Sequence, residues 1–173
     1  MDHTDLGTYL EHDGRPAVRF VRSYPHPIER VWAAVTEPAE LAHWFPSAVA
    51  VHPHAGGTIE FSFDPNMDPM RGRVLEFDPP RRFSFTWGGD ELHLSLEPDG
   101  DGCVFTMLNV LEQRDTAARN GAGWVVCLAE LDTHLSGGET EGPRSEGALA
   151  WQPVYDAHLA AGVPHGAAIP TGA

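Results

Sequence analysis

Four arginines are the clearest local group of side chains that could hold a ligand. The whole chain has 11 basic residues, all of them arginines. Four of these flank one predicted strand and its turn: Arg71, Arg73, Arg81 and Arg82. Arg73 has the same strand parity as Leu75, so an inward Leu75 predicts an inward Arg73. A guanidinium placed there would hold a carboxylate or phenolate by paired hydrogen bonds. The other interpretation is that these arginines are solvated or pair with nearby acids such as Glu60.

Metal binding and catalysis receive little support from the spacing of residues. His52 and His54 form an H-x-H pair near His43, but no third ligand stands at a suitable distance, and we expect solvated loop histidines. Cys103 and Cys127 form no CxxC pair and are expected to be reduced thiols. No paired carboxylates and no G-x-S-x-G motif occur. We therefore expect no metal, no cofactor and no catalytic residue.

Aromatic and large apolar side chains recur at positions that predict an interior face. Each of them could simply fill a core, or the set could line a pocket for an apolar molecule. With Arg73 as a polar anchor, the candidate cavity-lining residues are Trp32, Trp44, Phe45, Phe61, Phe63, Leu75, Phe85, Trp87, Leu94, Met107, Trp124 and Leu128.

The elements that would position these side chains follow from the hydrophobic periodicity. A strand over 17–24, preceded by a run over 7–13, is followed by a helix starting at Pro27 and a short helix over 38–44. From residue 59 to 111 the period is two, with turns between the runs, which predicts an antiparallel meander. The complete sheet is expected to have six or seven strands.

A long helix is predicted over 116–136, with Trp124, Leu128, Leu131 and Leu135 on one stripe. Gly121 and a second glycine at 123 weaken its first half, since each costs about 1 kcal/mol relative to alanine.

Beyond this helix we expect a flexible polar linker over 139–147. A C-terminal helical extension and tail over 148–173 then pack outside the main domain, which spans 1–138, or on a second subunit.

The charge balance excludes some partners. The chain of 173 residues carries 25 acidic and 11 basic side chains, a formal net charge of −14. A protein this acidic is a poor candidate for nucleic acid or anionic membranes. The first residues lack a basic n-region and an apolar run, and no stretch reaches 18 apolar residues, so a cytoplasmic location is expected.

The chain resembles the SRPBCC, or START-like, helix-grip superfamily. Within it, the chain is most similar to the group named after the activator of the ATPase of the 90-kDa heat-shock chaperone. The residues that carry the resemblance are Pro27–Trp32, Thr36–Pro38, Leu41, Trp44–Phe45, Gly56–Gly57, Gly72–Val74, Asp78–Arg82, Phe85–Trp87, Gly123–Trp124, Leu128 and Leu131. The resemblance implies an α+β fold, in which a curved antiparallel sheet wraps a long C-terminal helix and two short helices follow the first strand.

The same resemblance implies a cavity between sheet and helix. The leading hypothesis is non-enzymatic binding of a small, mostly apolar molecule, aromatic or lipid-like. One alternative is an enzyme similar to polyketide cyclases and dehydratases. Another is a stress- or chaperone-linked interaction module, with a homodimer or a protein partner.

Overall fold

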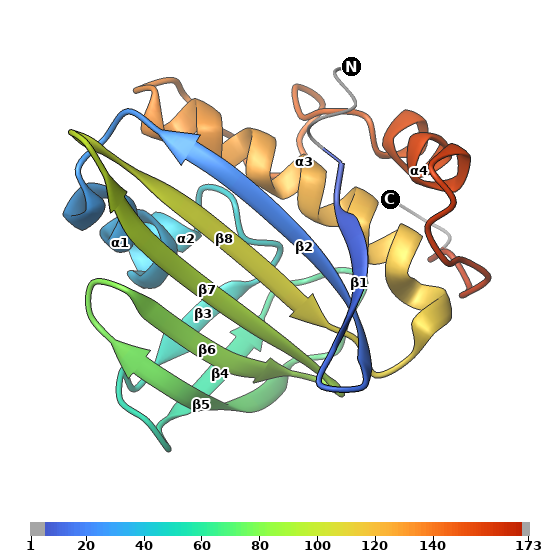
Figure 1. The fold of residues 1–173 in the computed structure, drawn as a ribbon, viewed down its shortest axis with the longest axis horizontal. Coiled ribbons are helices and arrows are strands. Elements are labelled where there is room, and N and C mark those ends of the chain that lie inside the picture. The colour runs from blue at the N-terminus through green and yellow to red at the C-terminus, as the bar shows by residue number, and fades with distance from the viewer. Residues whose placement is uncertain (1–5, 171–173) are drawn as a thin grey trace.

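An eight-stranded antiparallel sheet and one long helix dominate the computed structural model, which describes residues 6–170 (Figure 1). The strands are β1 (Thr8–His12), β2 (Arg15–Tyr24), β3 (Ala48–Val51), β4 (Thr58–Ser62), β5 (Met70–Asp78), β6 (Arg82–Trp87), β7 (Asp90–Asp99) and β8 (Gly102–Val110). Their order across the sheet is β1-β2-β8-β7-β6-β5-β4-β3. The antiparallel meander predicted from the period of two is therefore confirmed.

The eighth strand was not predicted from the sequence. β3 has only four residues, Ala48–Val51, and lies at the edge of the sheet with half-buried Val49 and Val51. A four-residue run of alanine and valine carries too weak an alternation to separate it from a loop. His52 and His54 follow it and are exposed.

Helices α1 (Ile28–Thr36) and α2 (Pro38–Leu41) follow β2 and close one end of the fold. Pro27 is the N-cap of α1 rather than its first residue, and Glu29 lies in its first turn. Buried Val31 and Val35 place the predicted apolar stripe against the core. The expected short helix over 38–44 ends earlier, at Leu41, and continues as turns.

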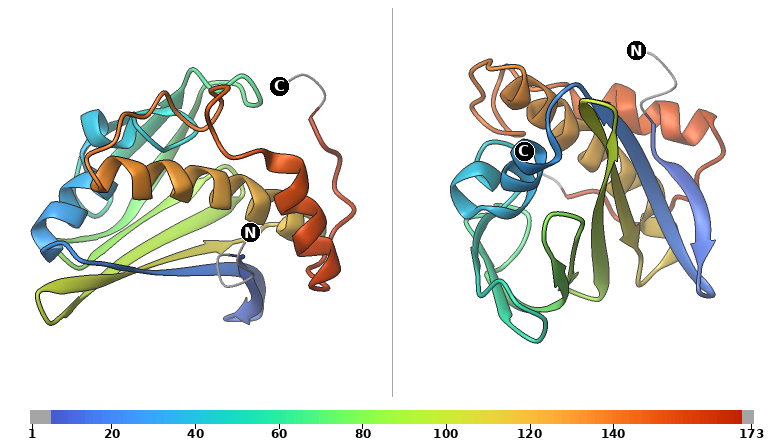
Figure 2. Two further views of the ribbon diagram at one scale, coloured as in Figure 1. Left: turned by 90° about the horizontal axis from the view of Figure 1, so that it is seen from above. Right: turned by 60° about the vertical axis from the view of Figure 1, so that its left-hand side comes forward.

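Helix α3 (Ala117–Leu135) lies along one face of the sheet, as Figure 2 shows from above. Its predicted stripe of Trp124, Leu128, Leu131 and Leu135 is buried in the main core. A short 3-10 turn, η2 (Arg114–Thr116), connects β8 to this helix. A curved sheet with one apolar face needs such a cover.

Helix α4 (Trp151–Ala160) packs beside the first half of α3. His158 of α4 is fully buried, and its Nε2 accepts a hydrogen bond of 3.1 Å from the N–H of Gly7. Its Nδ1–H donates to the carbonyl of Val154 at 2.8 Å. Gly121 of α3 faces this ring, because a Cβ there would stand 3.0 Å from Nε2.

The chain beyond α4 also packs on α3. The N–H of Ala118 donates to the carbonyl of Pro164 at 2.9 Å, and the Arg119 guanidinium donates to the carbonyl of Ala168 at 2.9 Å. None of the helices within residues 6–170 is long and apolar enough to cross a membrane.

Candidate functional site

An aromatic cluster fills the space between α3 and the curved part of the sheet. The rings of Phe45, Trp87 and Trp124 contact one another, with centroids 5.1 to 6.1 Å apart. Phe61 and Phe85 extend the cluster towards β4 and β6, with centroids 6.0 and 6.3 Å from that of Phe45. Such a cluster offers apolar surface to a flat molecule if the rings separate.

The indole N–H groups of Trp44, Trp87 and Trp124 differ in their partners. Trp124 Nε1 donates to Asn109 Oδ1 at 3.1 Å, and Trp44 Nε1 donates to the carbonyl of Ala34 at 2.9 Å. Trp87 Nε1 is buried and has no hydrogen-bond partner. It is the single buried side-chain nitrogen or oxygen without a partner in the described part of the chain.

A buried polar network adjoins the cluster at the β6–β7 hairpin. Fully buried Asn109 of β8 donates from Nδ2 to Asp90 Oδ2 at 3.1 Å, and Asn120 of α3 donates to the same oxygen at 3.2 Å. The N–H of Glu112 donates to Asp90 Oδ1 at 2.9 Å. Burial raises the pKa of the Asp90 carboxyl group, although the hydrogen bonds from Glu112 and Asn109 oppose this rise. With three donors aimed at it, this carboxyl group organises the network.

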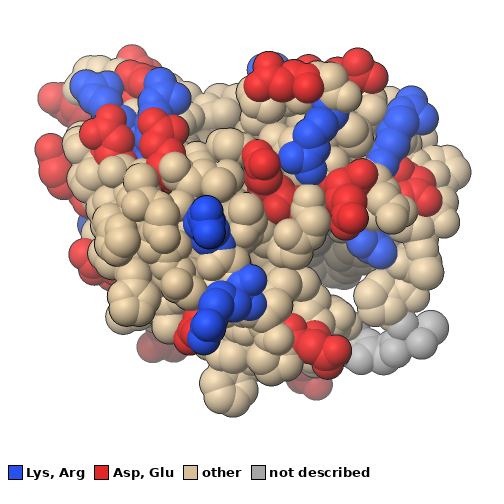
Figure 3. Space-filling model, turned by 90° about the horizontal axis from the view of Figure 1, so that it is seen from below, with Lys and Arg blue, Asp and Glu red and all other residues tan. Residues whose placement is uncertain are grey.

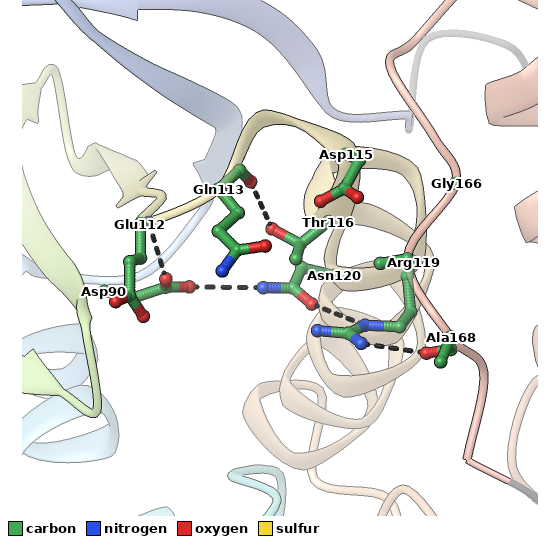
Figure 4. Close-up of a pocket in the computed structure, with 10 residues that line it drawn as sticks. Asp90, Glu112, Gln113, Asp115, Thr116, Arg119, Asn120, Gly166 and Ala168 are labelled. Carbon is green, nitrogen blue, oxygen red and sulfur yellow. Dashed lines mark hydrogen bonds between the residues drawn. The ribbon is translucent and has the colours of Figure 1, made fainter.

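The network forms one wall of a polar pocket of about 450 Å³ at the start of α3 (Figure 4). Glu112, Gln113 and Asp115 line one side, and the backbone of residues 166–168 lines the other. Arg119 projects along this side of α3 and donates to Asn120 Oδ1 at 3.2 Å. The pocket is acidic, because three carboxylates outnumber one guanidinium.

The segment 139–147, here called the strap, lies between α3 and α4 in the chain. It is bonded to the residues that precede β3 and follow β4. Arg144 donates from Nη2 to Asp64 Oδ1 and from Nη1 to the carbonyl of Pro46, both at 2.6 Å. The Asp64 side chain is only 5% exposed, so this is a buried carboxylate paired with a half-buried guanidinium. Cys127 is buried on α3, and its burial raises the pKa of its thiol to about 12.

Most predicted cavity residues do face the interior. Trp32 is half-buried but lies away from the cluster, against Phe77 at 5.5 Å between centroids. Trp87 is half-buried at the end of β6. The fully interior positions are Trp44, Phe45, Phe61, Phe85, Leu94, Met107, Trp124 and Leu128. They pack on one another as a core, and the ligand role of each remains a prediction.

Three of the predicted cavity-lining residues lie on the surface of the protein instead: Phe63, Arg73 and Leu75. The register of β5 against β6 shifts between Val74 and Glu76, so Leu75 is the extra residue of a β-bulge. Val74 is therefore the buried residue, Leu75 is 40% exposed and Arg73 is exposed. Phe63 follows the end of β4, with a positive φ of 58° and a side chain that is 90% exposed.

The arginine cluster also behaves as a solvated surface. Arg71 pairs with Glu60 at 2.7 Å, as the alternative interpretation anticipated, and Arg81 pairs with Glu97 at 2.8 Å. On the face drawn in Figure 3, most basic side chains lie beside acidic ones rather than gathering into one basic patch. Arg73 therefore does not place a cation at the aromatic cluster.

The sequence interpretation missed the polar network and the anchoring of the strap. Asn109 carried a signal that was available, because an amide in the middle of an otherwise apolar strand must find buried partners. Arg144 and Asp64 carried no such signal, since residues 80 positions apart in a polar loop and a turn have no periodic relation.

A curved antiparallel sheet wrapped around a long helix, with two short helices after the second strand, defines the helix-grip class of proteins. The family model described as "Activator of Hsp90 ATPase homolog 1-like protein" matches residues 25–136, and the chain belongs to this family.

Solved structures with the same fold share little sequence with this chain. CalU16 from Micromonospora echinospora, in its solution structure, is 22% identical over 88% of each chain, with a TM-score of 0.68. EF2215 from Enterococcus faecalis, described as a conserved protein of unknown function, is 17% identical over 90% of this chain and 89% of its own, with a TM-score of 0.70. DynU16, from the dynemicin biosynthetic locus, is 24% identical over 69% of this chain and 47% of its own, with a TM-score of 0.61. Curated proteins gave no match.

Proposed function

We propose that this protein binds a small, mostly apolar, aromatic molecule between α3 and the sheet, without chemical conversion. The observation that carries the proposal is the cluster of Phe45, Trp87 and Trp124, which includes a buried indole N–H that no protein group satisfies. A pure core would favour rings without a polar atom at such a position. The likeness to DynU16, from a biosynthetic locus, supports a ligand of small-molecule kind.

The apolar surface of the aromatic rings would supply the affinity for such a ligand. A ligand that slides between the rings would gain roughly 25 cal/mol for each Å² of apolar surface removed from water, before the costs of association.

An enzyme of the cyclase or dehydratase kind would need an acid or base that can exchange a proton beside the cluster. Asp90 is the acid that the network brings nearest, and its oxygens already accept three hydrogen bonds. Because these donors occupy its oxygens, we propose that Asp90 positions its neighbours in this protein.

A protein-interaction module would instead need a large exposed apolar patch. The large apolar side chains most exposed among residues 6–170, such as Val21, Phe63 and Leu75, lie on different elements. The two cysteines, both buried and free, support the reducing cytoplasm as the place where the protein acts.

The proposal is tested by native mass spectrometry of the protein purified from its own host and of the same protein mixed with fluorene and 9-fluorenone. We expect a co-purifying small apolar molecule, or a complex of one probe per chain that changes tryptophan fluorescence. The Trp151→Phe variant is the control, because Trp151 stacks on Tyr155 of α4, with centroids 4.7 Å apart, and should not report on the site. A clean apo mass together with no binding of either probe would refute the proposal.

A further inference from the structure

The unpartnered indole of Trp87 has a consequence for the kind of ligand that fits the site. Its Nε1 is shielded from water and lies among Phe45 and Trp124, which present ring faces and edges. Aromatic rings are weak acceptors for an N–H donor. A buried donor without an acceptor is unfavourable, so the free protein holds a hydrogen-bonding capacity that it does not use.

The neighbouring donors show that this is specific to Trp87. Trp124, in contact with it, has its own acceptor in Asn109 Oδ1, and Trp44 has a backbone carbonyl. The chain thus supplies acceptors for the indole N–H groups of Trp44 and Trp124 and none for that of Trp87. A phenylalanine ring would fill the same cluster without the unpaired N–H.

The charge around Trp87 restricts the acceptor further. Asp90 is the cross-strand partner of Trp87 in the β6–β7 hairpin, and its carboxyl oxygens accept hydrogen bonds from three donors. Arg73 donates from its N–H to Thr86 Oγ1 at 2.9 Å, but its side chain is exposed. The arginines near Asp90 are already bonded to protein groups, Arg119 to Asn120 and Ala168 and Arg15 to Glu91 and Gly89. A carboxylate on the ligand would therefore lie close to the acidic side chain of Asp90 without a free arginine to pair with it, in a site where screening by water is weak.

We propose that the ligand of this site carries a neutral carbonyl oxygen on an aromatic or flat apolar frame, and that Trp87 Nε1–H donates a hydrogen bond to that oxygen. This inference rests on the proposed function and adds the polar feature that the ligand must have. Trp87 is then the residue that selects among apolar molecules of similar shape, while Phe45 and Trp124 contribute contact area.

Three probes of one frame test the inference: fluorene, 9-fluorenone and fluorene-9-carboxylate. We expect wild-type protein to bind 9-fluorenone about five- to tenfold more tightly than fluorene, the factor expected from one neutral hydrogen bond. The carboxylate should bind most weakly. In the Trp87→Phe variant the preference for the ketone over fluorene should fall to about one, because the loss of contact area weakens the binding of both probes alike. Trp151→Phe, the matched control, should keep the wild-type preference.

A second measurement detects the hydrogen bond in the wild-type protein. In a ¹H–¹⁵N spectrum of wild-type protein, one of the five indole N–H signals should move downfield with 9-fluorenone and not with fluorene. Its absence from the spectrum of Trp87→Phe would assign it. Equal binding of fluorene and 9-fluorenone, a ketone preference that survives in Trp87→Phe, or tightest binding of the carboxylate would overturn this inference alone. Failure of all three probes to bind, together with a clean apo mass, would overturn the proposed function and this inference with it.

Discussion

Two glycines in the first half of α3 allow a matched test of how α4 docks on the fold. Gly121 and Gly123 lie two residues apart in the same helix, and helix propensity predicts that each change to alanine is stabilising by about 1 kcal/mol. The structure predicts opposite effects for the two changes. A Cβ at Gly123 would meet no heavy atom within 4 Å, whereas one at Gly121 would stand 3.0 Å from His158 Nε2.

The His158 ring has little freedom to move away from such a Cβ. It is fully buried, donates to the carbonyl of Val154 and accepts from the N–H of Gly7. Moving it would weaken the bond from Gly7, worth about 1 kcal/mol, and would add an overpacking cost of about 1 kcal/mol or more. We therefore expect Gly123→Ala to be about 1 kcal/mol more stable than wild type and Gly121→Ala to be about 1 kcal/mol less stable.

Urea unfolding followed by circular dichroism measures both differences in one experiment. A gap of about 2 kcal/mol between the variants corresponds to about 4–8 °C in melting temperature for a chain of this size. If Gly121→Ala and Gly123→Ala raised the free energy of unfolding equally, the close packing of α4 against α3 would be refuted.

Two further predictions follow from buried polar contacts. Replacing Arg144 by Met leaves the Asp64 carboxylate buried without its cation, and because the guanidinium is partly exposed we expect a loss of about 1–3 kcal/mol. The same change should release the strap and speed the reaction of Cys127 with dithiobis(nitrobenzoic acid) at pH 8. Burial lowers the pKa of His158 in the folded protein, so the unfolded chain binds more protons between that value and the ordinary value of about 6.5. The stability that the neutral ring contributes is complete above about pH 6.5 and is lost as the pH falls through the pKa of His158 in the folded protein. Protonation of the ring should then weaken the hydrogen bond that Nε2 accepts from the N–H of Gly7. Urea unfolding at pH 5 and 7.5 should show a smaller loss in His158→Gln than in wild type.

Each of these measurements has its own control. Cys103 is also buried and free, but it lies on β8 away from the strap, so its labelling in a Cys127→Ser background should not change with Arg144→Met. Equal acceleration at both thiols would mean global loosening rather than release of the strap. An unchanged pH dependence in His158→Gln would show that other groups carry the acid sensitivity.

Local periodicity was sufficient for most of the fold. Alternation over Phe83, Phe85 and Trp87 predicted β6, and the stripe from Trp124 to Leu135 predicted α3, because both patterns repeat at the period of one regular element. The same reasoning gave a wrong prediction for β5, because this strand has a β-bulge at Leu75. One inserted residue reverses the faces of the strand on one side of it, so Arg73 and Leu75 point outward although parity placed them inside.

The amino-acid sequence by itself determined the class of this protein: an acidic chain, an antiparallel meander, a long amphipathic helix and the motifs of the helix-grip family. These are properties of neighbouring residues, whose contacts depend on backbone repeats of two or about four positions. Only the tertiary structure decided which polar groups meet. Asp90 with Asn109, Arg144 with Asp64 and Trp87 without an acceptor are relations between distant segments. They depend on how the sheet curves and how the chain returns across α3, and no local pattern encodes either.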